Sequence, residues 1–418
     1  MRVTRLFCLL LLLAGCDNTP TPTDSGVTPD SGMADAGPAV DCSGRPADAP
    51  EMRGEVNGIY DEAGGRILVY GGDTAAPVDC MPRYNLVDEL WAFHLDCNSW
   101  ERITTTGGPG IRARHATTLD TQRNRMLFFG GRTREGFGMY TNYNDVWALD
   151  LATDTWEQIT TTGEGPSVRS SAVIAYDAAG DRMIVMGGNS STSGLTLTGV
   201  GDTWSLDLAT GAWTEITAAG GPAPRLYHGG VVVGTELLIY GGTPNFDGPF
   251  YADTFALDLA TDTWRTVNDG VTGEVPASRF GAEVFADGDD RLVMAMGHDF
   301  GPPSGLGNMN DVWALDVASG TWTQLQVGDA LTNGAAGFCD FPADFSTPQD
   351  GSPERRYSFV HVQDATRGWV FGGKTDCGNI NDVWELTLET GAWERRRTST
   401  GGEACNRTGR TGCSSLCF

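Results

Sequence analysis

Basic side chains that could bind an anion occur at repeated places in the sequence. An arginine leads each of six similar segments, at Arg53, Arg112, Arg169, Arg225, Arg279 and Arg356. Guanidinium groups match carboxylates in geometry, so such residues suit an anionic ligand. The basic candidates for ligand binding are Arg112, Arg114, Arg132 and Lys374. Lys374 is also the one lysine among the 418 residues.

A structural role competes with this interpretation for the leading arginines. Each could pair with a carboxylate of a neighbouring unit or with a carbonyl at the end of a strand. The obvious acids stand two residues before a repeated aromatic residue. The candidate partners are Asp145, Asp202, Asp253, Asp311 and Asp382. Because Arg132 and Lys374 have no counterpart in the other segments, we expect them to be the better binding residues.

Aromatic residues lie in the same variable segments, beside Asn, Asp and Arg. The aromatic candidates for ligand binding are Tyr140, Tyr143, Phe246, Tyr251 and Phe300. This composition suits a protein or a glycan ligand. The alternative is that these rings pack the loops against one another.

The sequence offers little for catalysis. No two of the five histidines have the spacing of metal ligands. Asp287-Gly-Asp-Asp290 lacks the spaced ligands of a calcium loop and is typical of a turn. We therefore assign no catalytic residue, metal or cofactor.

These candidates are positioned by a unit that occurs six times, at about 51–104, 110–160, 167–217, 223–268, 277–326 and 354–397. Paired glycines fall at Gly71-Gly72, Gly130-Gly131, Gly187-Gly188, Gly241-Gly242 and Gly372-Gly373, and the fifth unit has Gly297-His298 instead. Two aromatic residues nine apart follow: Trp91/Trp100, Trp147/Trp156, Trp204/Trp213, Phe255/Trp264, Trp313/Trp322 and Trp384/Trp393. We call these units repeats 1 to 6.

Each repeat predicts four short strands. In repeat 2 they are expected at His115–Leu119, Arg125–Phe129, Val146–Leu151 and Thr155–Ile159. Two residues before the second aromatic residue stand Asn98, Asp154, Gly211, Asp262, Gly320 and Gly391. These residue types adopt positive φ most readily, as a tight hairpin requires.

Six such units predict an all-β, six-bladed propeller at 51–398, with four antiparallel strands per blade. One unit alone would leave two apolar sheet faces exposed, so neighbouring units must stack. We expect the tryptophans to fill the space between blades. Strand exchange by the tail at ring closure stays open.

The glycine pair, the aromatic of the third strand and the Trp of the fourth strand together resemble the kelch-repeat β-propeller family, which includes the central domain of galactose oxidase. The segment ending at Trp156 also resembles the Asp box of sialidase propellers, but that motif has no upstream Gly-Gly. The resemblance implies a protein-binding face built from loops. It also leaves open a sugar oxidase with a Tyr-Cys-His copper site, or a sialate isomerase.

The first residues resemble a bacterial lipoprotein signal. Arg2 and Arg5 precede the apolar run Leu6 to Leu13, and Leu13-Ala14-Gly15-Cys16 resembles a lipobox. We expect a signal peptide at 1–15 and a lipid on Cys16. A disordered spacer rich in Thr, Pro, Asp and Gly is expected up to residue 50. The protein would then be anchored in the cell envelope, at the outer membrane or the cell surface. An ordinary secretion signal is the alternative.

Apart from Cys8 and Cys16, the cysteines are Cys42, Cys80, Cys97, Cys339, Cys377, Cys405, Cys413 and Cys417. An even number in an exported protein predicts disulfides. We expect a Cys339–Cys377 bridge, and a bridge from Cys42 to the Cys-rich tail at 399–418, for which Cys405 is a candidate.

The formal net charge of −26 argues against a nucleic-acid partner. Our main hypothesis is a monomeric, lipid-anchored propeller that binds a protein or a glycan through its loop face without catalysis. The alternatives are a carbohydrate-active enzyme and a structural envelope protein.

Overall fold

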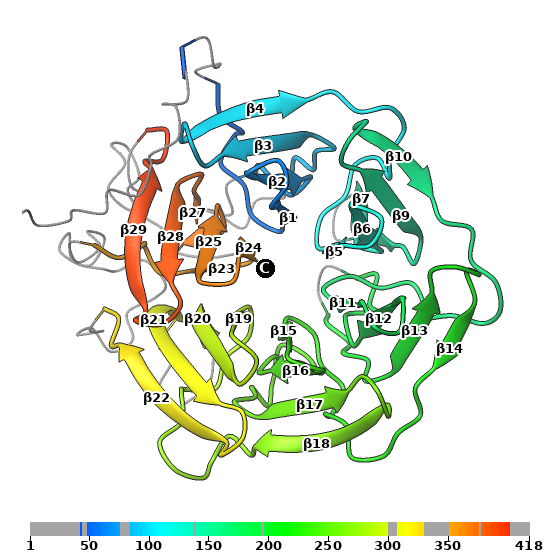
Figure 1. Ribbon diagram of the computed structural model, residues 1–418, viewed down its shortest axis with the longest axis vertical. Helices are drawn as coiled ribbons and strands as arrows, with labels where there is room; N and C mark the ends of the chain where they lie inside the picture. Colours follow the sequence, from blue (N-terminus) through cyan, green and yellow to red (C-terminus); the bar gives the residue numbers. More distant parts are fainter. Residues whose placement is uncertain are drawn as a thin grey trace, which may run out of the picture. The chain divides into compact units, whose positions relative to one another are not determined.

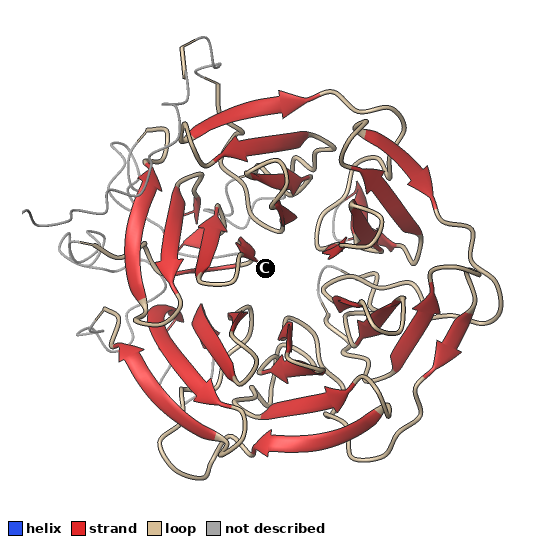
Figure 2. Ribbon diagram, viewed as in Figure 1, coloured by secondary structure: helices blue, strands red, loops and turns tan. Residues whose placement is uncertain are grey.

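The computed structural model describes residues 42–43, 48–75, 84–136, 139–193, 196–299, 307–329, 351–375 and 378–401. Residues Cys42–Phe418 form one compact unit. The described part of this unit contains strands and turns but no helix, and six of its sheets are four-stranded and antiparallel. Figure 1 shows them arranged around a central axis, and Figure 2 shows that loops make up the rest.

Repeats 1 to 3 have similar strand lengths. Repeat 1 contains β1 (Asn57–Asp61), β2 (Arg66–Tyr70), β3 (Leu90–His94) and β4 (Ser99–Ile103). Repeat 2 contains β5 (Ala116–Asp120), β6 (Arg125–Phe129), β9 (Val146–Asp150) and β10 (Thr155–Gln158). Repeat 3 contains β11 (Val173–Asp177), β12 (Arg182–Met186), β13 (Thr203–Asp207) and β14 (Trp213–Glu215). The predicted strands of repeat 2 are confirmed to within one residue.

Repeats 4 to 6 follow the same order. Repeat 4 contains β15 (Gly229–Val233), β16 (Glu236–Tyr240), β17 (Thr254–Asp258) and β18 (Thr263–Asn268). Repeat 5 contains β19 (Glu283–Asp287), β20 (Arg291–Asp299), β21 (Gly307–Asp316) and β22 (Thr321–Gln326). Repeat 6 contains β24 (Val360–Gln363), β25 (Arg367–Phe371), β28 (Val383–Thr387) and β29 (Ala392–Arg397).

Two small sheets add to this frame. The hairpin of β7 (Arg132–Gly136) and β8 (Met139–Asn142) rises from repeat 2 between its second and third main strands. In repeat 6 the matching place between β25 and β28 holds β26 (Lys374–Thr375) and β27 (Gly378–Asn379). These form a three-stranded sheet with β23 (Arg356–Tyr357), which precedes β24.

The first strand of every repeat lies nearest the axis, as Figure 1 shows. Each first strand contacts the first strand of the next repeat, and β24 of repeat 6 contacts β1 of repeat 1. This radial arrangement of four-stranded sheets is a β-propeller.

The paired glycines connect successive repeats. Gly71 has a φ of +67°, and a Cβ there would lie 2.4 Å from the carbonyl oxygen of Arg112. The N–H of Gly72 donates to that same oxygen at 2.9 Å. The bond recurs between Gly373 and Arg53 at 2.8 Å, which joins repeat 6 to repeat 1. A side chain at the first glycine would therefore push two repeats apart.

Repeat 5 corrects the predicted pair Gly297-His298. Met296 and Gly297 have φ values of +64° and +105°, which match the two glycines of the other repeats. Arg279 donates to the carbonyl oxygen of Met296 at 2.9 Å, as other leading arginines do to the first glycine. The motif is therefore displaced by one residue, and a buried methionine occupies the left-handed position.

The leading arginines form ion pairs with the predicted aspartates, but the prediction that each acid belongs to a neighbouring unit is wrong. Within each repeat the guanidinium lies 2.5–2.9 Å from a carboxylate two residues before the aromatic residue of the third strand. In repeat 1 the acid is Glu89 rather than an aspartate. In five repeats the indole N–H of the following Trp donates to the same carboxylate. Phe255 cannot do so in repeat 4.

Several tryptophans of the fourth strands pack against an aromatic ring of the preceding repeat. The ring centroids are 5.3 Å apart for Trp156 with Tyr70 and for Trp322 with Tyr240. Trp100 of repeat 1 contacts Phe371 of repeat 6 at 4.6 Å, so this packing also crosses the seam between the two ends. All three indoles are buried between repeats, as predicted.

Trp264 and Trp393 differ from this arrangement and correct the prediction that the tryptophans fill the space between blades. Both are only half-buried, at the edges of the apolar clusters between repeats 3 and 4 and between repeats 5 and 6. The residue that matches Tyr70 in the preceding repeat is Met186 for Trp264 and Ala295 for Trp393. Neither offers a ring for an indole to pack against. A ring alone does not ensure burial, because Trp213 is half-buried although its ring centroid lies 6.2 Å from that of Phe129 in the preceding repeat. The tryptophans Trp147, Trp204 and Trp213 are half-buried as well.

The hairpin between the third and fourth strands has a left-handed residue at the same position in every repeat. The six predicted turn residues, Asn98, Asp154, Gly211, Asp262, Gly320 and Gly391, all have positive φ. The prediction of a tight turn at this position is therefore confirmed.

The disulfide prediction for Cys42 is wrong. Cys42 is bonded to Cys97, in the turn between β3 and β4, and not to the tail. The covalent bond thus holds the segment before β1 at the outer edge of repeat 1. Cys339, Cys377 and Cys405 lie outside the described residues, so the other predicted bridges stay predictions. In the part of the chain that the structure describes, no helix could span a membrane.

We predict that Gly71→Ala destabilises the fold more than Gly65→Ala. Both glycines have positive φ, of +67° and +60°, so either alanine adopts an unfavourable backbone conformation that costs about 1 kcal/mol. A Cβ at Gly65 meets nothing within 4 Å, whereas a Cβ at Gly71 clashes with Arg112 and adds roughly 1–3 kcal/mol. Denaturant unfolding of both variants measures the difference, and equal losses would contradict this account of the glycine pair.

Candidate functional site

Six residues around the axis form a ring that we call the collar. Each stands two residues after a leading arginine: Glu55, Arg114, Ser171, Tyr227, Gly281 and Ser358. All six have left-handed backbones, with φ between +53° and +62°. Five of them are not glycine, so the fold holds side chains in a conformation that costs about 1–2 kcal/mol each. Such strain is typical of functional sites.

Backbone hydrogen bonds link the collar from repeat to repeat. The N–H of Arg114 donates to the carbonyl of Glu55 at 2.9 Å, and that of Ser171 donates to Arg114 at 2.8 Å. Glu55 in turn donates to Ser358 of repeat 6 at 3.0 Å. These bonds compensate the strain and fix the direction of each collar side chain.

A buried charge cluster occupies one side of the collar. Nη2 of Arg114 lies 2.6 Å from Oε1 of Glu55, and Nη2 of Arg132 lies 3.1 Å from Oε2. Nζ of Lys374 lies 2.5 Å from Oε1. The four side chains are almost completely buried. Three cations from repeats 2 and 6 therefore converge on a single carboxylate from repeat 1.

Local structure explains how these side chains meet. Arg132 begins β7, directly after the glycine pair of repeat 2, and Lys374 begins β26 after the pair of repeat 6. Gly54 leaves room for the lysine, because a Cβ there would lie 2.8 Å from Cγ of Lys374. Arg132 and Lys374, each the first residue after a glycine pair, therefore both point toward the collar.

The cluster carries more positive than negative charge. Burial by itself raises the pKa of Glu55, but Arg114, Lys374 and Arg132 outweigh it and hold that pKa well below its usual range. Asp73 also acts on this group, and burial, with Glu55 nearby, raises its pKa. Among these described side chains, three cations face two anions even when Asp73 is ionised. Nε of Arg114 and Nε of Arg132 are buried without a hydrogen-bond partner.

The β7–β8 hairpin extends this cluster to the surface. Arg132 lies 3.8 Å from the ring centre of Tyr140, and Arg134 lies 4.3 Å from that of Tyr84. Met139 is 58% exposed and Tyr84 is 39% exposed. The hairpin is held against repeat 3, because the N–H of Tyr140 donates to Thr192. We call Tyr84, Arg134, Met139 and Tyr140 the rim.

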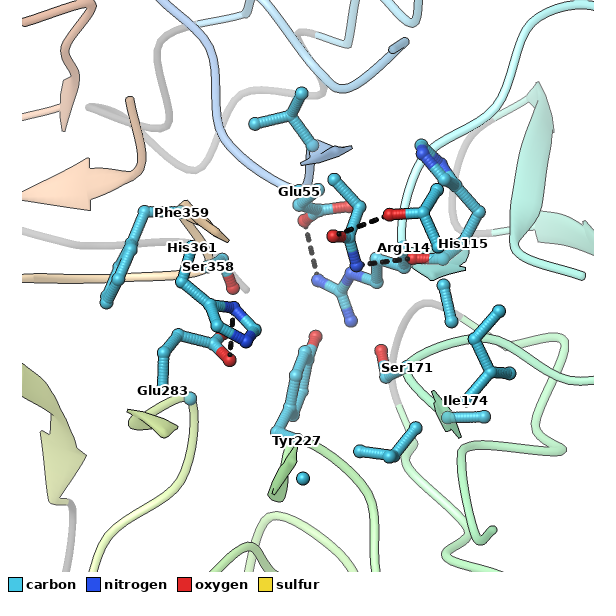
Figure 3. Close-up of a pocket in the computed structure, with 18 of the residues that line it drawn as sticks. Glu55, Arg114, His115, Ser171, Ile174, Tyr227, Glu283, Ser358, Phe359 and His361 are labelled. Atoms are coloured by element: carbon cyan, nitrogen blue, oxygen red, sulfur yellow. Dashed lines mark hydrogen bonds and ion pairs between the residues drawn. The ribbon is translucent and has the colours of Figure 1, made fainter. Parts of the chain in front are cut away.

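A pocket of about 140 Å³ opens at the collar and is lined by all six collar residues. Figure 3 shows Arg114 between Glu55 and Tyr227 on one side of it. On the other side Oε2 of Glu283 lies 2.9 Å from Nδ1 of His361. The pocket thus has a basic side and an acidic side.

Sequence reasoning predicted part of this site. The structure brings Arg114, Arg132, Lys374 and Tyr140 together. Arg112 instead pairs with Asp145 and lies 3.5 Å from the ring centre of Tyr143.

The remaining aromatic candidates lie outside the cluster. Tyr251 packs on the leading Arg225 at 4.3 Å. Phe246 lies half-buried in the loop after β16. The structure thus gives Arg112, Tyr143 and Tyr251 contacts within the frame, and a role in binding stays a prediction for them and for Phe246. Phe300 lies outside the described residues.

Sequence reasoning missed Glu55, Ser171, Tyr227, Glu283 and His361. The first three share a signal in the sequence. When the six repeats are aligned on the leading arginine, the residue two positions after it differs strongly from repeat to repeat. Glu283 and His361 lie on the first strands β19 and β24, where side chains alternate between the axis and the sheet interior.

The described residues contain no group of three or more His, Cys, Asp or Glu side chains that could hold a metal ion. His115 and His228 are buried, and burial lowers the pKa of each to about 3, so both are neutral near pH 7.

This geometry defines the class of protein. It is a β-propeller whose repeats share a pattern of Arg, Gly-Gly and Trp and differ in the side chains that they place around the axis. The family model described as the KLHDC2/KLHL20/DRC7 Kelch-repeats domain matches residues 39–242 and 174–341. The chain belongs to this kelch-repeat family.

Curated relatives match over part of their length. Acyl-CoA-binding domain-containing protein 5 of Arabidopsis thaliana is 31% identical over 236 residues, which are 56% of this chain and 33% of that protein. Kelch domain-containing protein 10 of Homo sapiens is 22% identical over 256 residues, 61% of this chain and 52% of that protein. The chain thus spans about a third to a half of these relatives.

We predict that Glu55→Gln destabilises the protein near pH 7 by about 3–5 kcal/mol, because it removes the counter-charge of three buried cations. The folded-state pKa of Glu55 lies below its usual value of 4.5, so its contribution is fully present above that pH. As the pH falls below 4.5, wild type loses this contribution and the difference from the variant shrinks.

Denaturant unfolding as a function of pH measures this difference. Exposed Glu157→Gln is the control and should change the free energy of unfolding little at any pH. A Glu55→Gln effect that stays constant down to low pH would contradict the assignment.

Proposed function

We propose that the chain is a six-bladed kelch propeller that binds an acidic segment of a protein ligand at its collar face. Six four-stranded sheets support the number of blades. The Gly373–Arg53 and Glu55–Ser358 hydrogen bonds, together with the Trp100–Phe371 contact, support closure of repeat 6 on repeat 1. A kelch-repeat propeller is itself consistent with protein binding.

The observation that carries the proposal is the excess of positive charge around Glu55. A buried cation without sufficient counter-charge is costly, and an incoming carboxylate would supply the missing charge. The whole chain has a net charge of −26, so a local positive site attracts an acidic ligand against the general repulsion.

The rim supplies the uncharged part of the binding surface. Tyr, Met and Arg are enriched in protein interfaces, and the rim combines all three. The hairpin is already held by its bonds to repeat 3, so binding costs little ordering entropy. A neutral glycan could stack on Tyr84 but would gain nothing from the charge, which is why we favour an acidic protein segment.

We predict that a fluorescein-labelled oligoglutamate peptide binds the full chain, and an oligoserine peptide does not. Lys374→Met and Arg134→Glu should each weaken binding at least about tenfold, because each removes attraction for the carboxylates. Fluorescence anisotropy at low and high salt measures this, and salt should weaken the binding.

Arg265→Glu is the matched control, because Arg265 lies on the outer strand β18 and pairs with Glu236, away from the collar. It makes the same change of net charge and should leave the affinity unchanged. Equal losses in Arg134→Glu and Arg265→Glu would contradict a localised site. Binding of neutral oligosaccharides, but not of oligoglutamate, would favour a glycan ligand instead.

The proposal includes a place for the protein: a monomer at the bacterial cell envelope, held by a lipid on Cys16. It is supported by the lipobox-like Leu13-Ala14-Gly15-Cys16 and the polar segment behind it.

We predict that labelled palmitate is incorporated into the wild-type chain but not into Cys16→Ser, and that the variant leaves the membrane fraction. Cys8→Ser should still be labelled and remain in the membrane fraction. Labelling of Cys16→Ser at the wild-type level would overturn the anchor.

A further inference from the structure

The collar pocket has features that binding of an acidic protein segment to the rim does not use. Arg114, Ser171 and Tyr227 lie on one side of it, and Glu283 with His361 lies on another (Figure 3). A purely anionic ligand has no use for the acidic side. We propose that the pocket binds a small zwitterion that carries a carboxylate and an ammonium group, such as a free amino acid.

The carboxylate end of such a ligand fits the basic side. Arg114 is more than nine-tenths buried, and its Nε has no hydrogen-bond partner. Oγ of Ser171 is buried without a partner as well. Both belong to the collar, whose backbone bonds fix their directions. Nε of Arg114 and Oγ of Ser171 are therefore two hydrogen-bond donors that a ligand carboxylate could accept from.

The ammonium end fits the acidic side. Oε2 of Glu283 lies 2.9 Å from Nδ1 of His361, and we assign the other carboxylate oxygen, Oε1, to the ligand. An ammonium group donates up to three hydrogen bonds and would use this oxygen. Glu283 is partly buried, so its attraction for a cation is less screened than at an open surface.

The size of the pocket limits the ligand. An engineered cavity of about 150 Å³ holds benzene, so a volume of about 140 Å³ suits roughly six to ten non-hydrogen atoms. Small and medium α-amino acids fall within this range. The pocket shares five lining residues with a second hollow of about 360 Å³, so the size limit applies to the part of a ligand that lies among the collar residues. The shared residues are Gly58, Thr117, Ile174, Gly230 and His361.

The test is isothermal titration of the full chain with alanine, serine and glutamate, compared with propionate and propylamine. Propionate lacks the ammonium group and propylamine lacks the carboxylate. We expect at least one amino acid to bind and both half-ligands to bind at least about tenfold more weakly, since each loses one charged contact. Absence of heat with every amino acid, or equal binding of propionate, would overturn the proposal.

Substitutions in the pocket test which side binds the carboxylate and which side binds the ammonium group of the ligand. Glu283→Gln should weaken amino-acid binding about tenfold or more and leave propionate binding unchanged. Ser171→Ala should weaken both, and it provides a second readout if the first variant fails to fold. Glu157→Gln should behave as wild type. Unchanged amino-acid affinity in both pocket variants would contradict the site.

The pocket variants leave Arg134 and Lys374 intact, so they should still bind oligoglutamate. Loss of amino-acid binding with peptide binding retained separates this inference from the proposed function. Failure of the peptide experiment leaves the pocket test unaffected, because its ligands and its variants are different.

Discussion

The architecture depends on the leading arginine of each repeat. Its guanidinium holds a carboxylate of its own repeat, and its backbone carbonyl accepts the N–H of a glycine from the preceding repeat. The same arginine therefore stabilises its own repeat through an ion pair and connects that repeat to the preceding one through a backbone hydrogen bond. An unpaired buried arginine would cost several kcal/mol, so the carboxylate and the arginine are needed together. The indole N–H on the same carboxylate completes the network.

This frame separates what the repeats share from what distinguishes them. Two residues beyond the arginine, the collar position is held by the backbone alone, so its side chain is free to vary. The six side chains are those of Glu, Arg, Ser, Tyr, Gly and Ser. Repeats 1 and 2 place Glu55 and Arg114 at this position, and Arg132 and Lys374 add their charges at the axis from outside the collar. Repeats 3, 4 and 5 provide the less charged lining and Glu283.

Much of the fold could be predicted from the sequence, because the determining residues recur. The Gly-Gly pairs and the turn residues are local and repeated. The acids that pair with the leading arginines also recur at a fixed place, although the sequence did not show that each pair lies within one repeat. Met296 escaped prediction because a methionine in a glycine position gives no local signal. The partial exposure of Trp264 and Trp393 escaped because the burial of an indole depends on packing between repeats, which the pattern within one repeat does not show.

The remaining features depend on contacts between distant parts of the chain. The Cys42–Cys97 bond escaped prediction because it depends on the path of the chain before β1. Glu55 escaped because a buried acid with three cations is recognisable only once repeats 1, 2 and 6 are brought together.

The central claim is that function lies at the collar face, where the repeats differ. Hydrogen–deuterium exchange of the full chain, with and without oligoglutamate, tests it most directly. We predict slower exchange in the β7–β8 hairpin and around Glu55, with no change in the turns that contain Asn98, Asp154 and Asp262. Protection confined to those turns would contradict the account, because they belong to the outer strand pairs that every repeat builds alike.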